Sequence, residues 1–299
     1  MRVPLPDFWP AARTGQRWLL RARRKEALVD GHRMVFLERG QAAPGTPTVV
    51  LIHGFAAMKE NWSLWMQKLP ADWHLLVPDV PGLGESQYRP DACYRFESQA
   101  RRLAAWLSGY PDSNLHLAGS SMGGAIVSVL AHLLPRPPCT LTLLNSAGIP
   151  ERPDIDPDAP FKTDRDDILI PRDWGGVYRM FNSVGNGKPS LPGLAMTGLL
   201  GPDLLQRRQS LRHIFNDMLA DPLAPVRYLG TDTPPLLVQW GDRDVITPTR
   251  CVDWFAAAMP HAEVHVFRGV GHLPMLEKPG LSAGVLQDFI RRHAPPASV

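Results

Sequence analysis

The sequence predicts an α/β protein whose mainly parallel, eight-stranded sheet is flanked by helices and carries one inserted, mostly helical cap. Two observations support the sheet: short apolar runs alternate with longer helix-compatible stretches from residue 26 onward, and the 299 residues suit one large domain. A third supports the cap, since the alternation stops between two core strands, over residues 149–233. The expected core is therefore made of residues 26–148 and 234–299, with the cap above the sheet edge where ligands bind.

The expected strands are short apolar runs bounded by turn-forming residues. They are Glu26–Asp30, His32–Glu38, Thr48–His53, His74–Pro78, Leu115–Ala118, Thr140–Leu144, Leu236–Trp240 and Glu263–Phe267. Apolar residues at helical spacing predict helices at Phe96–Leu107, Met122–Leu134 and 281–292, with cap helices around Trp174–Phe181 and Leu204–Leu219.

The net charge of +3 is unevenly distributed. Residues 1–25, expected as a basic N-terminal arm, hold seven Arg or Lys and one Asp, and the rest of the chain is net acidic. Nucleic-acid binding is not expected, because it needs a basic face on the folded domain. Residues 8–25 could rest on an anionic membrane as an amphipathic helix or pack on their own domain. No membrane-spanning run or secretory signal is recognised, so a soluble, cytoplasmic protein is expected.

The strongest motif is G-x-S-x-G at residues 119–123, between a predicted strand and a predicted helix. A sharp turn from strand to helix exposes the serine, and the flanking glycines remove Cβ atoms that would collide. Ser121 would then sit at a helix N-terminus, which favours a developing negative charge. We expect Ser121 to be a nucleophile.

A serine nucleophile needs a base, and His272 is the best placed of the ten histidines. It follows the last predicted strand, at the sheet edge where Ser121 must also lie. The acid that orients this base should follow a strand between the two, as Asp244 does after Leu236–Trp240. We favour Asp244 over Asp242, whose short side chain suits a turn.

Acyl transfer also needs two N–H donors for the oxyanion. The backbone of Met122, directly after the nucleophile, should supply one, and the backbone of Phe55 after Thr48–His53 should supply the other. His53 is expected to orient that loop rather than to act as a base. Five apolar side chains could contact an acyl group, although helical apolar residues more often serve packing: Trp174, Tyr178, Met180, Phe181 and Leu273.

No cofactor or metal is expected, because the chain has no phosphate-binding glycine loop and no histidine pair at metal-ligand spacing. The acidic residues Asp154, Asp156 and Asp158 lack the rest of a calcium-site pattern.

Several segments together resemble bacterial α/β-hydrolase lipases and carboxylesterases, a group that includes monoacylglycerol lipases. These segments are H-G-F-A-A-M-K-E-N-W (53–62), P-D-V-P-G-L-G-E-S (78–86), S-M-G-G (121–124), N-S-A-G (145–148) and G-H-L-P (271–274). The resemblance covers most of residues 26–293 and is weakest in the cap. It implies an α/β-hydrolase fold, a triad of Ser121, Asp244 and His272 with Phe55 and Met122 as oxyanion donors, and an ester substrate. The apolar residues of the cap favour a short to medium, hydrophobic acyl group.

Two other functions remain open. Meta-cleavage product hydrolases, which cut carbon–carbon bonds, share the Ser-Met-Gly-Gly segment but usually carry a Gly-Pro-rich oxyanion loop that this chain lacks. A non-catalytic protein of the same fold would bind a ligand without chemistry, but it would not need a complete triad. Thioesters and lactones would suit the same groups, and the sequence does not define the oligomeric state.

Overall fold

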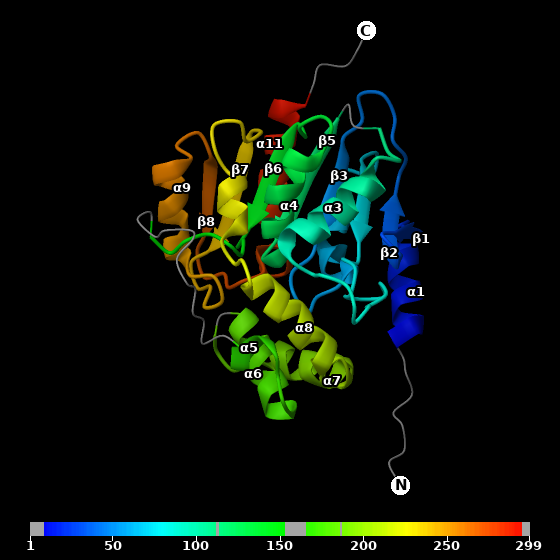
Figure 1. Cartoon of the computed structure of the whole chain (residues 1–299), viewed down its shortest axis with the longest axis vertical. Coiled ribbons are helices and arrows are strands. Elements are labelled where there is room, and N and C mark those ends of the chain that lie inside the picture. Colours follow the sequence, from blue (N-terminus) through cyan, green and yellow to red (C-terminus); the bar gives the residue numbers. More distant parts are fainter. Residues whose placement is uncertain (1–8, 112–113, 153–165, 186, 295–299) are drawn as a thin grey trace.

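The computed structural model describes residues 9–111, 114–152, 166–185 and 187–294. Residues 1–8 of the predicted arm and the acidic residues Asp154, Asp156 and Asp158 lie outside these ranges. One eight-stranded sheet forms the centre of the molecule (Figure 1), in the order β1-β2-β4-β3-β5-β6-β7-β8. The strands are β1 (Arg23–Val29), β2 (His32–Arg39), β3 (Thr48–Ile52), β4 (His74–Pro78), β5 (Leu115–Ser120), β6 (Thr140–Leu144), β7 (Leu236–Gly241) and β8 (Glu263–Phe267).

The sheet is parallel from β4 to β8, whereas β2 is antiparallel to both β1 and β4. Its central strands are buried on both faces, as in parallel sheets covered by helices. Alternate residues of β3 show this, because Val50 and Ile52 join one apolar core while Val49 and Leu51 join the other. The predicted α/β-hydrolase fold is therefore confirmed.

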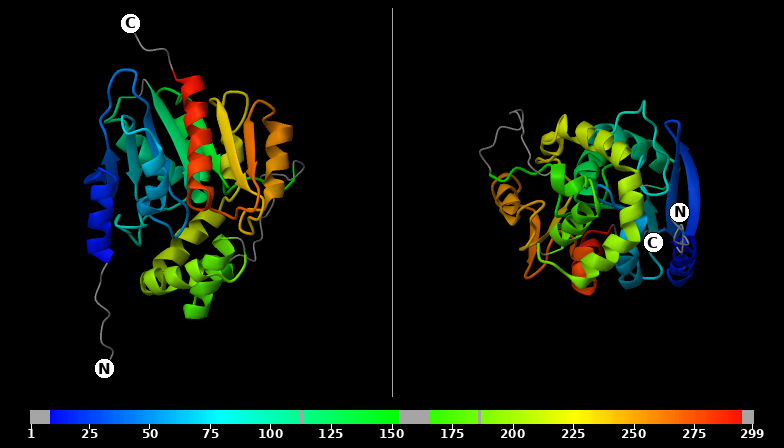
Figure 2. Two further views of the ribbon diagram at one scale, coloured as in Figure 1. Left: turned by 180° about the vertical axis from the view of Figure 1, so that it is seen from behind. Right: turned by 90° about the horizontal axis from the view of Figure 1, so that it is seen from below.

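Helices cover both faces of the sheet, as the views from the front and from behind show (Figures 1 and 2). One face carries α3 (Phe96–Leu107), α4 (Met122–Leu133) and α9 (Val252–Ala258). The other carries α2 (Ser63–Lys68), α10 (Pro274–Glu277) and α11 (Pro279–His293). The 3₁₀ turns are η1 (Lys59–Trp62), η2 (Ala224–Tyr228) and η3 (Thr249–Cys251).

Among the described residues between β6 and β7, where the sequence predicted a cap, four α-helices occur: α5 (Asp166–Leu169), α6 (Trp174–Val184), α7 (Leu191–Gln206) and α8 (Arg208–Leu219). We call α5–α8 the cap. They form the lower end of the molecule in Figure 1. The helix predicted at Leu204–Leu219 is broken at Arg207, and α7 begins well before it. Repeated Gly and Pro hid α7 from the sequence pattern, but Ser190 caps its N-terminus by accepting a hydrogen bond from the Gly193 amide (3.0 Å).

The described part of the N-terminal segment, from residue 9 onward, contains a helix and the start of a strand. Strand β1 starts at Arg23, before the predicted Glu26, because this edge strand is defined by pairing with β2 and not by apolar residues. Helix α1 (Trp9–Leu19) is joined to the domain by hydrogen bonds from Gln16 to the Ser63 hydroxyl (2.6 Å) and from Arg17 to Glu85 (2.9 Å). Within the described residues, no helix is both long and apolar enough to cross a bilayer.

One buried histidine in β5 makes the fold sensitive to acid. His116 is bonded to the Thr140 hydroxyl (2.9 Å) and to the Asn114 side-chain oxygen (2.8 Å), and burial lowers its pKa to about 4. An unfolded histidine titrates at about 6.5, so the unfolded chain binds this proton more tightly. The contribution of neutral His116 to the free energy of unfolding is fully present above about pH 6.5. It falls by about 3 kcal/mol as the pH is lowered towards about 4.

We therefore predict that His116→Gln loses less stability than the native chain when the pH is lowered. Urea unfolding at about pH 7 and about pH 4.5 would measure the change in unfolding free energy for both proteins. An equal acid-induced loss in both proteins would exclude His116 as the titrating group.

Candidate active site

Ser121 occupies a strained turn between β5 and α4. Its backbone has φ 54° and ψ −120°, a conformation that a non-glycine residue rarely adopts. The turn is held by the Ser121 amide, which donates to the Leu144 carbonyl (2.9 Å), and by the Ser121 carbonyl, which accepts from the Ala147 amide (3.0 Å). The hydroxyl makes no helix-capping bond and is partly exposed, so it remains accessible for chemistry.

The two motif glycines are required by close backbone approach. A Cβ atom on Gly119 would lie 2.2 Å from the Gly123 carbonyl oxygen, and one on Gly123 would lie 2.1 Å from the Ile52 carbonyl oxygen. Both distances are far inside van der Waals contact with backbone that cannot move away. The first turn of α4 can therefore pack against the end of β3 only without these side chains.

The loop after β3 lies directly against Ser121. A Cβ atom on Gly54 would be 3.2 Å from the Ser121 Cβ and 3.7 Å from its Oγ. Phe55, the next residue, packs its ring on Phe215 of α8 at 5.3 Å between ring centroids. The structure thus brings the Phe55 backbone and the N-terminus of α4, which begins at Met122, to the same place.

His53 is neutral, and its ring holds this loop in place. Its Nδ1 donates to the Gly54 carbonyl (2.8 Å), and its Nε2 accepts from the Val80 amide (3.0 Å). Burial lowers the pKa of His53, and this opposes protonation. These contacts agree with the orienting role that the sequence predicted for His53.

A cluster of buried charged side chains stabilises the same loop. The Lys59 ammonium group contacts Asp79 (2.7 Å) and Glu85 (2.5 Å), and Asp79 also accepts the Lys59 amide (2.7 Å). Glu85 in turn binds Arg17 of α1. Buried ion pairs of this kind add little net stability, but breaking one leaves an uncompensated charge. The cluster therefore specifies the position of the loop and joins the N-terminal helix to it.

Asp244 and His272 form a buried pair beyond the ends of β7 and β8. The Asp244 Oδ2 lies 2.8 Å from the His272 Nδ1, and the Oδ1 accepts the amides of Ile246 (2.7 Å) and Thr247 (3.0 Å). Burial by itself would raise the pKa of Asp244, but the charge and hydrogen bond of His272, together with hydrogen bonds from Thr247 and Asn145, lower the pKa below its usual value. Asp244 is therefore a carboxylate that keeps the Nδ1 proton on His272.

Asp242 does not take part in this pair. Its Oδ1 accepts the amide of Gly269 (2.7 Å), on the loop after β8. The structure thus distinguishes the two aspartates as the sequence suggested, although Asp242 braces a neighbouring loop rather than its own turn.

Asn145, which the motif analysis gave no role, connects Ser121 with the buried pair. Its backbone has φ 42°, its Nδ2 donates to the Asp244 Oδ2, and its Oδ1 accepts the Gly241 amide (3.3 Å). It lies between Leu144 and Ala147, the two residues that hold the Ser121 backbone. The only sequence signal was its place in the N-S-A-G segment.

Glu277 is a second residue that sequence reasoning missed. Its carboxylate accepts the amides of Gly271 (2.9 Å) and Leu273 (3.3 Å), the residues on either side of His272. Burial raises the pKa of Glu277. The carboxylate brackets the His272 backbone and so positions the ring.

The cap reaches the site through two contacts. The His272 amide donates to the Val184 carbonyl at the end of α6 (3.0 Å), and Phe215 of α8 packs on Phe55. The five predicted acyl contacts lie in different surroundings. Met180 is buried in the core, Phe181 and Leu273 are partly buried against the two cores, Tyr178 is partly buried, and Trp174 is half exposed and packs on Gly201 of α7. Their acyl contact stays a prediction.

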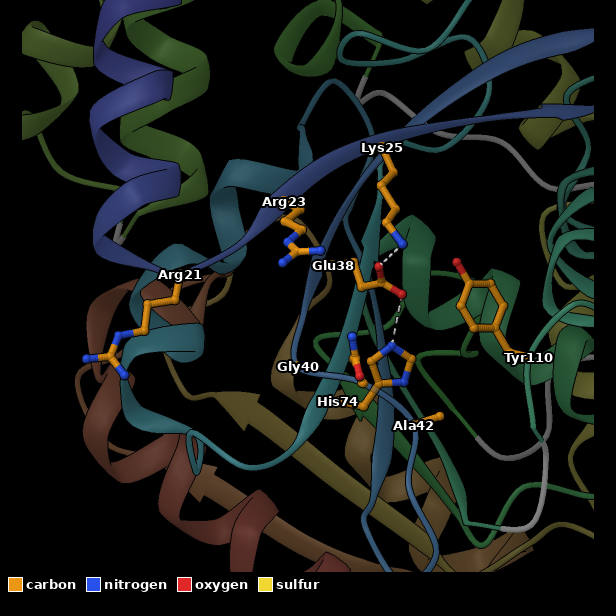
Figure 3. Close-up of a pocket in the computed structure, with 9 residues that line it drawn as sticks. Arg21, Arg23, Lys25, Glu38, Gly40, Ala42, His74 and Tyr110 are labelled. Carbon is orange, nitrogen blue, oxygen red and sulfur yellow. Dashed lines mark hydrogen bonds and ion pairs between the residues drawn. The ribbon is translucent and has the colours of Figure 1, made fainter.

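A pocket of about 490 Å³ lies at the opposite end of the sheet. Figure 3 shows Lys25 and His74 around Glu38, which bonds both of them. Burial would raise the pKa of Glu38, but these two hydrogen bonds help to lower it. Because His74 begins β4 whereas Ser121 follows the end of β5, this pocket is separate from the candidate site.

Comparison with known proteins shows the family of the chain. Residues 47–279 match the sequence profile of the alpha/beta hydrolase fold family. Lipase 1 of Psychrobacter immobilis is 31% identical over 252 residues, covering 84% of this chain and 78% of the lipase. A 2-hydroxy-6-oxononadienedioate/2-hydroxy-6-oxononatrienedioate hydrolase of Cupriavidus pinatubonensis is 27% identical, covering 87% of this chain and 92% of that enzyme.

Among solved structures, one described as a membrane phospholipase A and bacterial virulence factor superposes with a TM-score of 0.82. It is 27% identical in sequence, and the match covers 95% of this chain and 90% of the other. With the family profile matched over most of the sheet, the chain belongs to the α/β hydrolase fold family and is a hydrolase.

Proposed function

We propose that this protein is a serine hydrolase that cleaves carboxylic esters through an acyl-enzyme, with Ser121, His272 and Asp244 as its triad. The observation that best supports this triad is a series of contacts. They join the strained turn at Ser121, through Asn145, to the buried Asp244–His272 pair. Strain of this kind persists only where the surroundings impose it, and it concentrates at functional sites. A non-catalytic binding protein would not need such an arrangement.

The proposed reaction has two half-reactions. The Ser121 Oγ attacks the ester carbonyl carbon, and its proton moves to the Nε2 of His272, since Nδ1 is engaged with Asp244. The tetrahedral intermediate collapses, the carbon–oxygen bond to the alcohol breaks, and His272 gives the proton to the leaving alcohol. Water, deprotonated by His272, then attacks the acyl carbon. The second tetrahedral intermediate collapses, the bond from that carbon to the Ser121 Oγ breaks, the carboxylic acid leaves, and His272 returns its proton to the Ser121 Oγ.

The oxyanion would form between the loop after β3 and the N-terminus of α4. We assign the backbone N–H groups of Phe55 and Met122 as its donors, because Gly54 lies against Ser121 and Met122 begins α4. Donors fixed in the backbone before substrate binds stabilise this charge without reorganisation.

An ester with an apolar acyl group is the substrate class that fits best. Lipase 1 of Psychrobacter immobilis supports ester chemistry. The packed rings of Phe55, which follows the Gly54 that lies against Ser121, and of Phe215 would provide an apolar wall. The second candidate is carbon–carbon bond hydrolysis, which the Cupriavidus hydrolase supports by matching over nearly its whole length.

We predict that Ser121→Ala lowers turnover of p-nitrophenyl esters by about 10⁴-fold or more, because triad residues act as a unit. The fold should be retained, since alanine only removes a hydroxyl. Steady-state kinetics and circular dichroism measure both. The matched control is Ser120→Ala, which removes a buried hydroxyl one residue earlier and should stay active. Esterase activity retained in pure Ser121→Ala protein would reject the nucleophile.

We predict that Asp244→Asn lowers kcat by about 10²-fold to 10⁴-fold, since a neutral amide no longer stabilises the imidazolium of His272. The variant should also lose part of its stability near neutral pH. Because the native pKa of Asp244 lies below its unfolded value, its stabilising contribution is present above the unfolded pKa and is lost as the pH falls through the native pKa.

Kinetics together with urea unfolding at several pH values would test both effects of Asp244→Asn. The matched control is Asp242→Asn, which changes the neighbouring aspartate that contacts Gly269 instead of His272. Comparable losses of kcat in both variants would exclude a specific role for Asp244.

We predict that Glu277→Gln lowers kcat by about 10-fold to 100-fold with little change in KM, because the backbone on both sides of His272 loses one anionic acceptor and the ring is less well positioned. Initial rates measured over a range of ester concentrations give kcat and KM separately. A change confined to KM or to thermal stability would show that Glu277 does not position the base.

A further inference from the structure

The pocket around Glu38 lies at the end of the sheet opposite Ser121, and the proposed reaction does not use it. It is bounded by the edge strands β1 and β2, by the start of β4 and by the segment that follows α3. Its volume of about 490 Å³ is within the range of pockets that hold small molecules. Its lining contains no aliphatic side chain larger than alanine, so the pocket is unsuited to an apolar acyl group.

The pairing of β1 with β2 places the charged side chains of this pocket on one face of the sheet. Arg23 lies opposite Glu38 in the antiparallel register, and Lys25 follows two residues along β1, so the three share a face. This face is the one that carries α3, because Phe36, the partner of Lys25, packs on Trp106 at 5.0 Å between ring centroids.

Glu38 at the centre of the pocket is already compensated. Lys25 donates to one carboxylate oxygen, and the His74 Nε2 donates to the other (3.2 Å). Although burial opposes it, these hydrogen bonds lower the pKa of Glu38 and keep it ionised. The His74 ring is held at its other nitrogen by the Thr48 hydroxyl (3.1 Å). The carboxylate is therefore an acceptor in a fixed position.

The arginines of this pocket provide positive charge that is not compensated. Arg21 and Arg23 are exposed, and neither forms an ion pair or a side-chain hydrogen bond with a residue that the structure describes. Figure 3 shows Arg23 and Tyr110 on opposite sides of Glu38, with Arg21 at the outer border. Two arginines and Lys25, set against one carboxylate, leave an excess of two positive charges.

Tyr110 adds a neutral donor to these cations. Burial, together with the charge of Glu38, raises the pKa of Tyr110 to about 12, so its hydroxyl keeps its proton. Its ring lies 5.9 Å from the ring of His74, between centroids. The pocket thus contains an arginine fork, an ammonium group and a hydroxyl donor around one acceptor.

We propose that this pocket binds a small phosphate monoester whose organic part carries hydroxyl groups. A phosphate dianion matches the excess of two positive charges. Its three terminal oxygens suit three donors: the guanidinium of Arg23, the ammonium group of Lys25 and the hydroxyl of Tyr110. Lys25 has three N–H groups, so it can bind the phosphate without releasing Glu38.

The volume of the pocket exceeds what a phosphate group alone would fill, which leaves room for the organic part. The Glu38 carboxylate and the amide of Gln41, which also lines the pocket, can hydrogen-bond its hydroxyl groups. Arg21 at the border attracts the anion from solution. The ligand would contact the N-terminal edge of the sheet and stabilise the folded chain by mass action.

Isothermal titration calorimetry of the full chain with glucose 6-phosphate, in about 0.15 M NaCl, tests the site. The sugar phosphate should bind at least about fivefold more tightly than inorganic phosphate, and glucose should show no binding. Arg23→Gln should weaken binding at least about tenfold, because an uncompensated cation is lost. The matched control is Arg268→Gln, directly after β8, which changes another exposed arginine without an ion pair among the described residues and should bind normally.

A variant with the opposite expected effect is Glu38→Gln. It should bind glucose 6-phosphate about threefold more tightly, because a like charge is removed from the pocket and Lys25 is released. Circular dichroism of each variant checks the fold. Weaker binding by Glu38→Gln in folded protein would contradict the proposal, since damage to the pocket and not charge would then govern affinity.

Three further outcomes would overturn the proposal. They are no binding of glucose 6-phosphate, equal binding by Arg23→Gln and Arg268→Gln, and binding of succinate as tight as that of glucose 6-phosphate, which would assign the pocket to dicarboxylates. Turnover of a p-nitrophenyl ester by Arg23→Gln should equal that of the native protein. Absent esterase activity in the native chain would reject the proposed function and leave the calorimetric result standing.

Discussion

The close approach of three backbones around Ser121 is the constraint on which the rest of the site depends. The end of β3, the end of β5 and the first turn of α4 meet so closely that Gly119 and Gly123 leave no room for a Cβ atom. The backbone conformation of Ser121 is the result of this packing, since its φ of 54° is maintained by hydrogen bonds to neighbouring residues rather than by its own preference. Parallel strands make this possible, because their carboxyl ends lie at one edge of the sheet.

The polar groups at this edge form two hydrogen-bonded sets, one on each side of Ser121. Asn145 joins the Ser121 turn to Asp244, and Glu277 holds the backbone on both sides of His272. On the other side, His53 and the Lys59–Asp79 pair hold the loop that carries Phe55. Each group is hydrogen-bonded, and all but the partly exposed Glu277 are buried, so their positions are determined before any substrate arrives. Such preorganisation is what electrostatic stabilisation of a transition state requires.

The sequence was sufficient for the sheet and for most of the residues that the site brings together. The strand Thr140–Leu144, for example, contains only Thr and Leu, is buried throughout, and has the limits that the sequence predicted. Strand β1 began earlier than predicted because its exposed side chains carry no periodic signal, and α7 was missed because Gly and Pro reduce its helix propensity. Asn145 and Glu277 are polar residues whose importance arises only from contacts across the fold, which local patterns do not encode.

Covalent labelling with a fluorophosphonate, followed by mass spectrometry of the digested protein, tests whether Ser121 is an activated nucleophile. The reagent reacts with a serine hydroxyl that a neighbouring base activates and an oxyanion site stabilises, so a single adduct reports all three elements together. We expect one adduct, on the peptide that contains Ser121, and we expect it to be absent in the Asp244→Asn variant. No adduct, or an adduct on another residue, would contradict the account.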